Sequence, residues 1–167
     1  SYPKSCLIDN SKKNYISKKQ SFSGVKDLTI VTPSKWLADL VSVSFLREYK
    51  TVVIPNGIDL DIFKPTKSDF KEKMNLQDKK IILGVANIWN KRKGLEHFFE
   101  LNRFLPSEYV IVLVGLSNRQ GNNIPEGIVG LGKTSSVNKL VQIYSAADVF
   151  VNPTLEDNYP TVNYLQV

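Results

Sequence analysis

The most constraining feature of this sequence is an alternation between apolar runs of strand length and stretches with helical periodicity. The runs, which are rich in β-branched residues, occupy 28–34, 51–57, 79–87, 109–115, 127–132 and 148–152. Between them, apolar residues recur three or four positions apart, as in Leu95, Phe98 and Phe99. Continuous apolar strands separated by amphipathic helices are typical of βαβ units. We therefore predict an α/β fold, a Rossmann-like parallel sheet with helices on both faces.

Three polar loops follow strands of this predicted sheet. They are NIWNKRKG (87–94), GLGKTSS (130–136) and NPTLEDNYP (152–160). Doubly wound sheets place their ligands at the carboxyl ends of the strands, so we expect these loops to meet at one site. Nearer the N-terminus, Ser34 is positioned to cap a helix, and a short helix is expected near 67–75.

Composition narrows the classes of protein to consider. No apolar run approaches the roughly 18 residues that a membrane-spanning helix needs, and the first ten residues lack the apolar core of a signal peptide. The lone cysteine, Cys6, fits a reducing cytoplasmic setting. One His and one Cys do not make a metal-binding cluster. No Walker loop or G-x-G-x-x-G fingerprint follows a strand, so neither a simple NTPase nor a nicotinamide enzyme is supported.

Positive charge is concentrated at the N-terminus. Residues 1–27 hold six lysines against two aspartates, a balance of +4, which leaves +2 of the total charge of +6 for residues 28–167. This segment contains no arginine and only three aromatic residues, so we do not expect nucleic acid as a partner. A solvated helix face is one explanation, and contact with an anionic membrane surface is the other.

Two clusters of charged residues lie in the predicted ligand loops. Lys91, Arg92 and Lys93 stand where a strand gives way to a helix, a position that favours phosphate binding. The alternative is three solvated charges in a surface turn. Glu156 and Asp157 are adjacent, so they suit sugar hydroxyls or a developing positive charge better than paired acid–base work. The alternative to a ligand contact is that one of these carboxylates caps the next helix.

Several motifs, taken together and in order, resemble a known family. VTPSKWLADLV, VIPNGIDLDIFKP, ILGVANIWNKRKGL, IVLVGLS and LVQIYSAADVFVNPTLEDNYPTVN resemble the retaining glycosyltransferases of family 4, of the capsule, lipopolysaccharide and exopolysaccharide type. Those enzymes have the GT-B fold, with two Rossmann-like domains facing across a cleft. The resemblance implies that residues 1–55 are the tail of the acceptor domain, 56–66 the crossover, and 67–167 an incomplete donor domain.

The resemblance also implies roles for individual residues. Lys93 matches the lysine that binds the donor diphosphate, with Arg92 beside it; Asn87 and Ile88 stand where the family often has an arginine. The loop at Lys133 and Thr134 corresponds to the one that contacts the nucleotide base.

In the acidic motif, counting four from Pro153 makes Asp157, rather than Glu156, the carboxylate that contacts the donor sugar. Asn158 and the backbone amides after it, beginning with that of Tyr159, are expected to add phosphate or sugar contacts. The motif's second acid would fall at position 165, which is Leu.

The function implied is transfer of a hexose from a UDP- or GDP-linked sugar to a polysaccharide or lipid-linked glycan, without an essential metal or other cofactor. We expect a cytoplasmic protein with peripheral contact at the inner face of the plasma membrane, and little activity from this chain alone. Two alternatives remain: an epimerase or glycogen-synthase-like enzyme of the same fold, and a non-enzymatic nucleotide-binding module. We also expect the strand at 28–32 to lack its native neighbours, and so to join the donor-domain sheet or self-associate.

Overall fold

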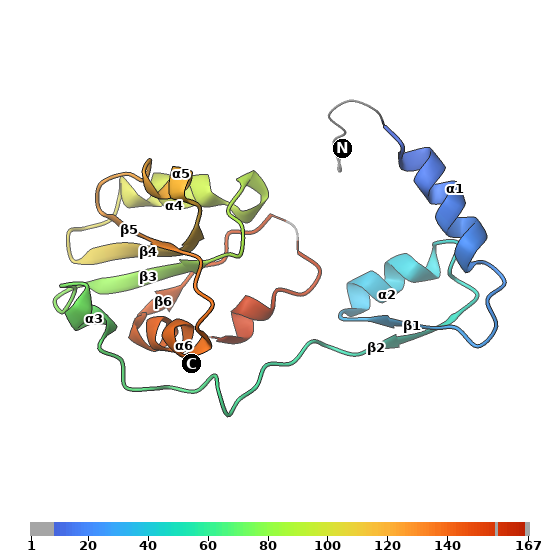
Figure 1. The fold of residues 1–167 in the computed structure, drawn as a ribbon, viewed down its shortest axis with the longest axis horizontal. Helices are drawn as coiled ribbons and strands as arrows, with labels where there is room; N and C mark the ends of the chain where they lie inside the picture. The colour runs from blue at the N-terminus through green and yellow to red at the C-terminus, as the bar shows by residue number, and fades with distance from the viewer. Residues whose placement is uncertain (1–8, 156, 166–167) are drawn as a thin grey trace. The chain divides into compact units, whose positions relative to one another are not determined.

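The structure is a computed structural model that describes residues 9–155 and 157–165 (Figure 1). The chain separates into two compact units, residues 1–56 and 57–167. The division falls in the segment 56–66 that the sequence suggested as a crossover. From Gly57 onward this segment belongs with the second unit: Phe63 packs against its core, and the Thr66 N–H donates to Ser145 Oγ at 3.1 Å.

The first unit has its own small sheet. Strand β1 (Thr29–Thr32) pairs in parallel with β2 (Lys50–Val53), and helix α2 (Lys35–Ser42) connects them. Ser34 caps α2 as predicted, its Oγ accepting from the Leu37 N–H at 3.2 Å. The expectation that 28–32 would join the donor-domain sheet is wrong, because β1 pairs with β2 in a separate two-stranded sheet. Self-association through this strand stays a prediction.

The basic segment forms helix α1 (Ser11–Phe22), which buries none of its residues. Its contacts are with the end of the first unit's chain: Tyr15 packs edge-on against Phe45 with ring centroids 5.4 Å apart, and Tyr49 Oη donates to the Phe22 carbonyl at 2.6 Å. The lysines of α1 therefore stay in solvent. Among the described residues, no helix is both long and apolar enough to cross a membrane.

The second unit is built on a four-stranded parallel sheet in the order β5-β4-β3-β6. Its strands are β3 (Lys80–Val85), β4 (Tyr109–Leu116), β5 (Ile128–Gly132) and β6 (Val149–Phe150). Its helices are α3 (Phe70–Lys73), α4 (Leu95–Asn102), α5 (Asn118–Gly121) and α6 (Val137–Ala146), with 3₁₀ turns η1 (Lys91–Lys93) and η2 (Thr161–Leu165). Helix α3 is shorter than the expected 67–75, and it ends just before Asn75, which adopts a left-handed conformation with φ of 55°. The sequence did not predict α5.

Helices cover both faces of this sheet, which confirms the predicted fold class (Figure 1). Successive residues of β3 point to opposite faces: Ile81 packs in the cluster with Ile143 and Tyr144 of α6, whereas Ile82 packs in the cluster with Phe98 of α4. Burying an apolar side chain of this size stabilises the fold by about 1.5–3 kcal/mol. Continuous apolar strands are therefore what a sheet covered on both faces requires.

The strand order places a topological switch point beside β3. From β3 the chain winds outward through β4 to β5, then returns by α6 to lay β6 on the opposite side of β3. The loops after β3 and β6 therefore lie beside each other at the carboxyl end of the sheet. Ligands of open parallel sheets bind at such a point.

Candidate functional site

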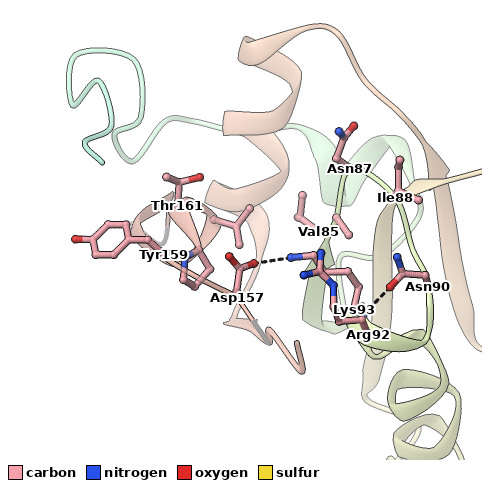
Figure 2. A pocket seen from close by; sticks show the side chains of 12 residues that line it. Val85, Asn87, Ile88, Asn90, Arg92, Lys93, Asp157, Tyr159 and Thr161 are labelled. Atoms are coloured by element: carbon pink, nitrogen blue, oxygen red, sulfur yellow. Dashed lines mark hydrogen bonds and ion pairs between the residues drawn. The ribbon is translucent and has the colours of Figure 1, made fainter. Parts of the chain in front are cut away.

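A cavity of about 390 Å³ lies at the carboxyl ends of β3 and β6, where the switch point predicts a ligand site (Figure 2). One wall consists of residues 85–88, 90 and 92–93, from the end of β3 and the loop that follows. The other wall consists of residues 157 and 159–162, from the segment after β6. Two of the three loops predicted to meet do so here.

A buried tryptophan fixes the loop after β3. Trp89 is 4% exposed, its indole Nε1 donates to the Val114 carbonyl at 2.9 Å, and its ring packs edge-on against Phe98. The Gln120 side-chain amide donates to the Trp89 carbonyl at 3.0 Å, while its oxygen accepts from the Ser117 N–H in the capping box that begins α5. The loop is thus held to β4 and α5, so the residues that follow it have a fixed starting point.

Asn90 and Gly94 set the geometry of the cationic turn η1 between them. The Asn90 side-chain oxygen accepts from the Lys93 N–H at 3.0 Å and so caps the turn. Gly94 ends it in a left-handed conformation, with φ of 73°. The backbone of Lys93 is therefore fixed, and Figure 2 shows its side chain reaching across the cavity toward Asp157.

Two backbone contacts join the walls of the cavity. The Leu155 N–H donates to the Arg92 carbonyl at 3.0 Å. A Cβ atom at Gly94 would lie 2.7 Å from the Pro153 carbonyl oxygen and 2.8 Å from its Cγ, so only glycine allows this approach. The segment after β6 is consequently positioned by direct contact with η1.

A salt bridge spans the cavity between Lys93 and Asp157. Lys93 Nζ lies 2.6 Å from Asp157 Oδ2, and the two side chains are 22% and 27% exposed. Partial burial disfavours the charged form of Asp157. The hydrogen bond and positive charge of Lys93, with the backbone N–H groups of Tyr159 and Asn158, outweigh that effect and hold the pKa of Asp157 below its usual value. Asp157 is therefore an ionised carboxylate at neutral pH.

The cavity thus combines two cations and one carboxylate. Arg92 lines it beside Lys93 and is exposed, and among the described residues it forms no salt bridge. Guanidinium and ammonium groups bind phosphate oxygens, and a carboxylate accepts hydrogen bonds from hydroxyl groups. The arrangement suits a ligand with an anionic part and a hydroxylated part. A purely structural ion pair between two loops is the simpler alternative.

The structure brings some of the predicted site residues together and separates others. Asn87, Arg92, Lys93, Asp157 and Tyr159 line the cavity. Asn158 does not line it, although its backbone N–H helps to lower the pKa of Asp157. Glu156 lies outside the described residues.

The loop at Lys133 and Thr134 follows β5, two strands away from β3, and does not line this cavity. Thr134 Oγ1 accepts instead from the Ser136 N–H at 3.2 Å. The role that the family resemblance implies for this loop stays a prediction.

Sequence reasoning missed the residues that shape the site without contacting a ligand. Trp89, Asn90, Gly94 and Gln120 carry no chemistry of their own, yet they position Lys93 and Arg92. The Asn-Lys-Arg-Lys-Gly spacing was the available signal, since Asn is a favoured N-cap and Gly a favoured left-handed residue. The sequence also did not predict three further residues that line the cavity, Pro160, Thr161 and Val162.

Comparison with known proteins gives distant relatives. No family model matches the sequence. The chain is 25% identical over 150 residues to the processive diacylglycerol alpha-glucosyltransferase of Acholeplasma laidlawii, covering 83% of this chain and 44% of that enzyme. It is 25% identical over 154 residues to the alpha-galactosylglucosyldiacylglycerol synthase of Streptococcus pneumoniae, covering 83% and 40%. The chain therefore spans less than half the length of these curated relatives.

Solved structures share the fold. Sucrose-phosphate synthase from Thermosynechococcus elongatus matches with a TM-score of 0.73 at 18% identity, covering 96% of this chain and 43% of that one. Anabaena HepE in complex with UDP and glucose matches with a TM-score of 0.74 at 14% identity, covering 93% and 46%. The chain therefore shares the fold of part of these GT-B glycosyltransferases, and it is distantly similar in sequence to two glycolipid-forming glycosyltransferases.

Proposed function

We propose that this chain carries the nucleotide-sugar-binding site of a retaining hexosyltransferase. The observation that carries the proposal is the meeting of Lys93 and Asp157, from loops after two different strands, in a cavity at the switch point. Arg92 adds a second cation to the same wall. A donor with a UDP or GDP diphosphate supplies the matching charge, and structures of HepE with UDP and with UDP-glucose support such a donor.

In this proposal the two kinds of charged group have separate tasks. Lys93 and Arg92 stabilise the negative charge that develops on the departing diphosphate, without an essential metal ion. Asp157 accepts hydrogen bonds from the donor sugar and stabilises the oxocarbenium character of its anomeric carbon. Both interactions strengthen as charge separates, so they lower the barrier more than they tighten ground-state binding.

The acceptor we favour is a lipid-linked or lipid molecule at the inner face of the plasma membrane. The two curated relatives are named for diacylglycerol-based glycolipids. Helix α1 keeps Lys12, Lys13, Lys18 and Lys19 exposed, as a segment that contacts anionic headgroups requires. A polysaccharide acceptor of the capsule or lipopolysaccharide type remains the alternative. Binding of the chain to vesicles containing anionic lipid, compared with neutral vesicles, tests the membrane contact.

One observation favours a second candidate, donor binding without turnover. Position 165, where the family resemblance places a second acid, is Leu. A module that binds nucleotide-sugars without transferring them would keep the Lys93 and Asp157 side of the site and tolerate that change. Measuring UDP release from UDP-glucose separates the two candidates, since only a transferase or hydrolase releases UDP.

Thermal unfolding with and without ligand tests the binding site itself. UDP, GDP and their sugars should raise the unfolding temperature, because a ligand at about 100 times its Kd stabilises the folded state by about 2.7 kcal/mol. Uridine and guanosine, which lack the diphosphate, serve as matched controls and should have little effect. Equal shifts with nucleoside and nucleoside diphosphate, or no shift with any of them, would contradict the proposed site.

A further inference from the structure

The cation that a donor diphosphate would need is already engaged in this structure. Lys93 Nζ contacts Asp157 Oδ2 at 2.6 Å, in the cavity and between its two walls (Figure 2). The backbone N–H of Lys93 is also engaged, since it donates to the Asn90 side chain at 3.0 Å. An anion entering the cavity therefore meets a lysine whose charge is neutralised by a neighbouring carboxylate.

We propose that Asp157 is an exchangeable counter-ion of Lys93, and that a donor diphosphate displaces it. The inference rests on the proposed function and concerns the regulation of that same site. Before binding, the carboxylate occupies the position that a phosphate oxygen takes afterwards. On binding, Lys93 transfers its contact to the diphosphate, and Asp157 is released to face the sugar.

The geometry allows this exchange at low cost. Both side chains retain partial exposure, 22% for Lys93 and 27% for Asp157, so neither charge is stranded in an apolar interior when the pair separates. Lysine carries a point charge on a flexible stem, so it can turn while its backbone stays capped by Asn90. The exchange thus needs a side-chain movement and leaves the loop in place.

Asp157 also remains held after Lys93 leaves. The backbone N–H groups of Asn158 and Tyr159 also help to lower the pKa of its carboxylate. Because these groups belong to the backbone beside Asp157, they continue to favour its charged form when its cation departs. Lys93 is therefore the replaceable partner of Asp157, and the two amides are the permanent ones.

The exchange makes the cavity selective for ligands with at least two anionic groups. A single phosphate only substitutes for the carboxylate that it displaces. A diphosphate does that and also reaches Arg92, which lines the same wall and is exposed. UDP should therefore bind much more tightly than UMP.

Calorimetric titration of UDP into four proteins tests the counter-ion: the wild-type chain, Asp157→Asn, Lys93→Met and the double variant. Asparagine keeps the shape of Asp157 and removes its charge, so Asp157→Asn should bind UDP about tenfold more tightly, the scale of one charge-assisted hydrogen bond. In the Lys93→Met background the same change should alter the affinity by about threefold or less, because the lysine to be released is absent.

Asp69→Asn is the matched control. Asp69 pairs with Lys73 at 2.7 Å and lines no part of the cavity, so removing the same charge there should leave the UDP affinity unchanged. Lys93→Gln replaces Lys93→Met if the latter unfolds, as judged by circular dichroism. With either background, the difference between the two Asp157→Asn effects is the measured quantity.

The outcomes separate this inference from the proposed function. If wild type binds UDP and Asp157→Asn binds it equally or more weakly, the proposal that Asp157 is an exchangeable counter-ion is wrong. The proposed donor site is not contradicted by that result. Equal tightening with and without Lys93 also overturns it, because the effect is then general repulsion. If neither wild type nor Asp157→Asn binds UDP or inorganic pyrophosphate, both proposals fail.

Discussion

Two Lys–Asp pairs join distant segments of the second unit, one at each end of the parallel sheet. Lys71 and Asp148 lie 2.9 Å apart where β3 begins, and Lys93 and Asp157 lie 2.6 Å apart where β3 ends. Both aspartates have a lowered pKa, because hydrogen bonds and a nearby lysine outweigh partial burial.

Their surroundings differ. Asp148 also accepts from the Ile81 N–H at 2.8 Å, and Lys71 donates to the Lys79 carbonyl at 3.0 Å, so the first pair closes a local network. The second pair spans a cavity, and among the described residues neither of its side chains forms a hydrogen bond with a strand. The same kind of ion pair thus stabilises the fold at the amino end of the sheet and, as we propose, binds a ligand at the carboxyl end.

Gly94→Ala should have the largest effect of these substitutions on both the stability and the ligand site of the second unit. Its φ of 73° and a Cβ only 2.7 Å from the Pro153 carbonyl combine two costs, which we expect to lower the free energy of unfolding by about 2–3 kcal/mol. UDP affinity should fall as the cavity walls separate. Gly121→Ala is the control, since a Cβ there meets nothing within 4 Å. Chemical denaturation gives the unfolding free energy of both variants, and equal values would contradict the close contact between Gly94 and Pro153.

Replacing the aspartate of each pair should separate the two roles. Asp148→Asn weakens a charged hydrogen-bond network at a position that keeps 41% exposure, so we expect a loss of about 1 kcal/mol in unfolding free energy with UDP affinity unchanged. Asp157→Asn should cost about 1 kcal/mol or less in unfolding free energy, because its pair joins two loops and not a strand, while it alters UDP affinity. Denaturation gives the unfolding free energy of both variants, and calorimetry gives their UDP affinity. A larger stability loss in Asp157→Asn, with UDP affinity altered only in Asp148→Asn, would contradict the two roles.

Acid should weaken the wild-type fold more than it weakens Asp148→Asn. The pKa of Asp148 is lowered from its usual 3.8, so its stabilising effect is fully present above that value. The effect is lost as the pH falls through the lower folded-state pKa. Denaturation curves at pH 6 and below pH 4 should therefore converge for the two proteins at low pH. A constant difference between them across that range would contradict the role of Asp148.

The smallest effect belongs to an ion pair outside both networks. Asp69, the N-cap residue of α3, and Lys73, four residues later, have side chains that are 55% and 66% exposed. Exposed pairs of this kind contribute about 0.3–0.5 kcal/mol, so Asp69→Asn should be close to neutral in unfolding free energy. A loss as large as that of Asp148→Asn would mean that the network around Ile81 adds nothing.

The sequence predicted the sheet and its helices because their signal is local. The β-branched runs and the helical spacing of Leu95 and Phe98 need no knowledge of distant residues. The position of α5 lacked such a signal, since its four residues carry no apolar period. The pairing of β1 with β2 was missed because the family resemblance suggested distant partners for β1, whereas the nearest strand provides one.

The site was predicted in part for a related reason. Lys93 and Asp157 were placed at the correct end of the sheet by the rule for parallel strands. Their contact depends on β6 returning beside β3 and on the close approach of Gly94 to Pro153, which no local pattern reveals. The same strand order places β4 between β5, which the Lys133 loop follows, and the cavity at β3.

The return of β6 to the far side of β3 has a consequence for how the protein is made. The two residues of the cavity salt bridge are 64 positions apart, and three helices and three strands are synthesised between them. Contacts of such long range form late, because the intervening chain must be closed into a loop first. A nascent chain emerging from the ribosome therefore builds β3, β4 and β5 before this cavity exists, and the nucleotide binding that we propose would report that β6 has docked.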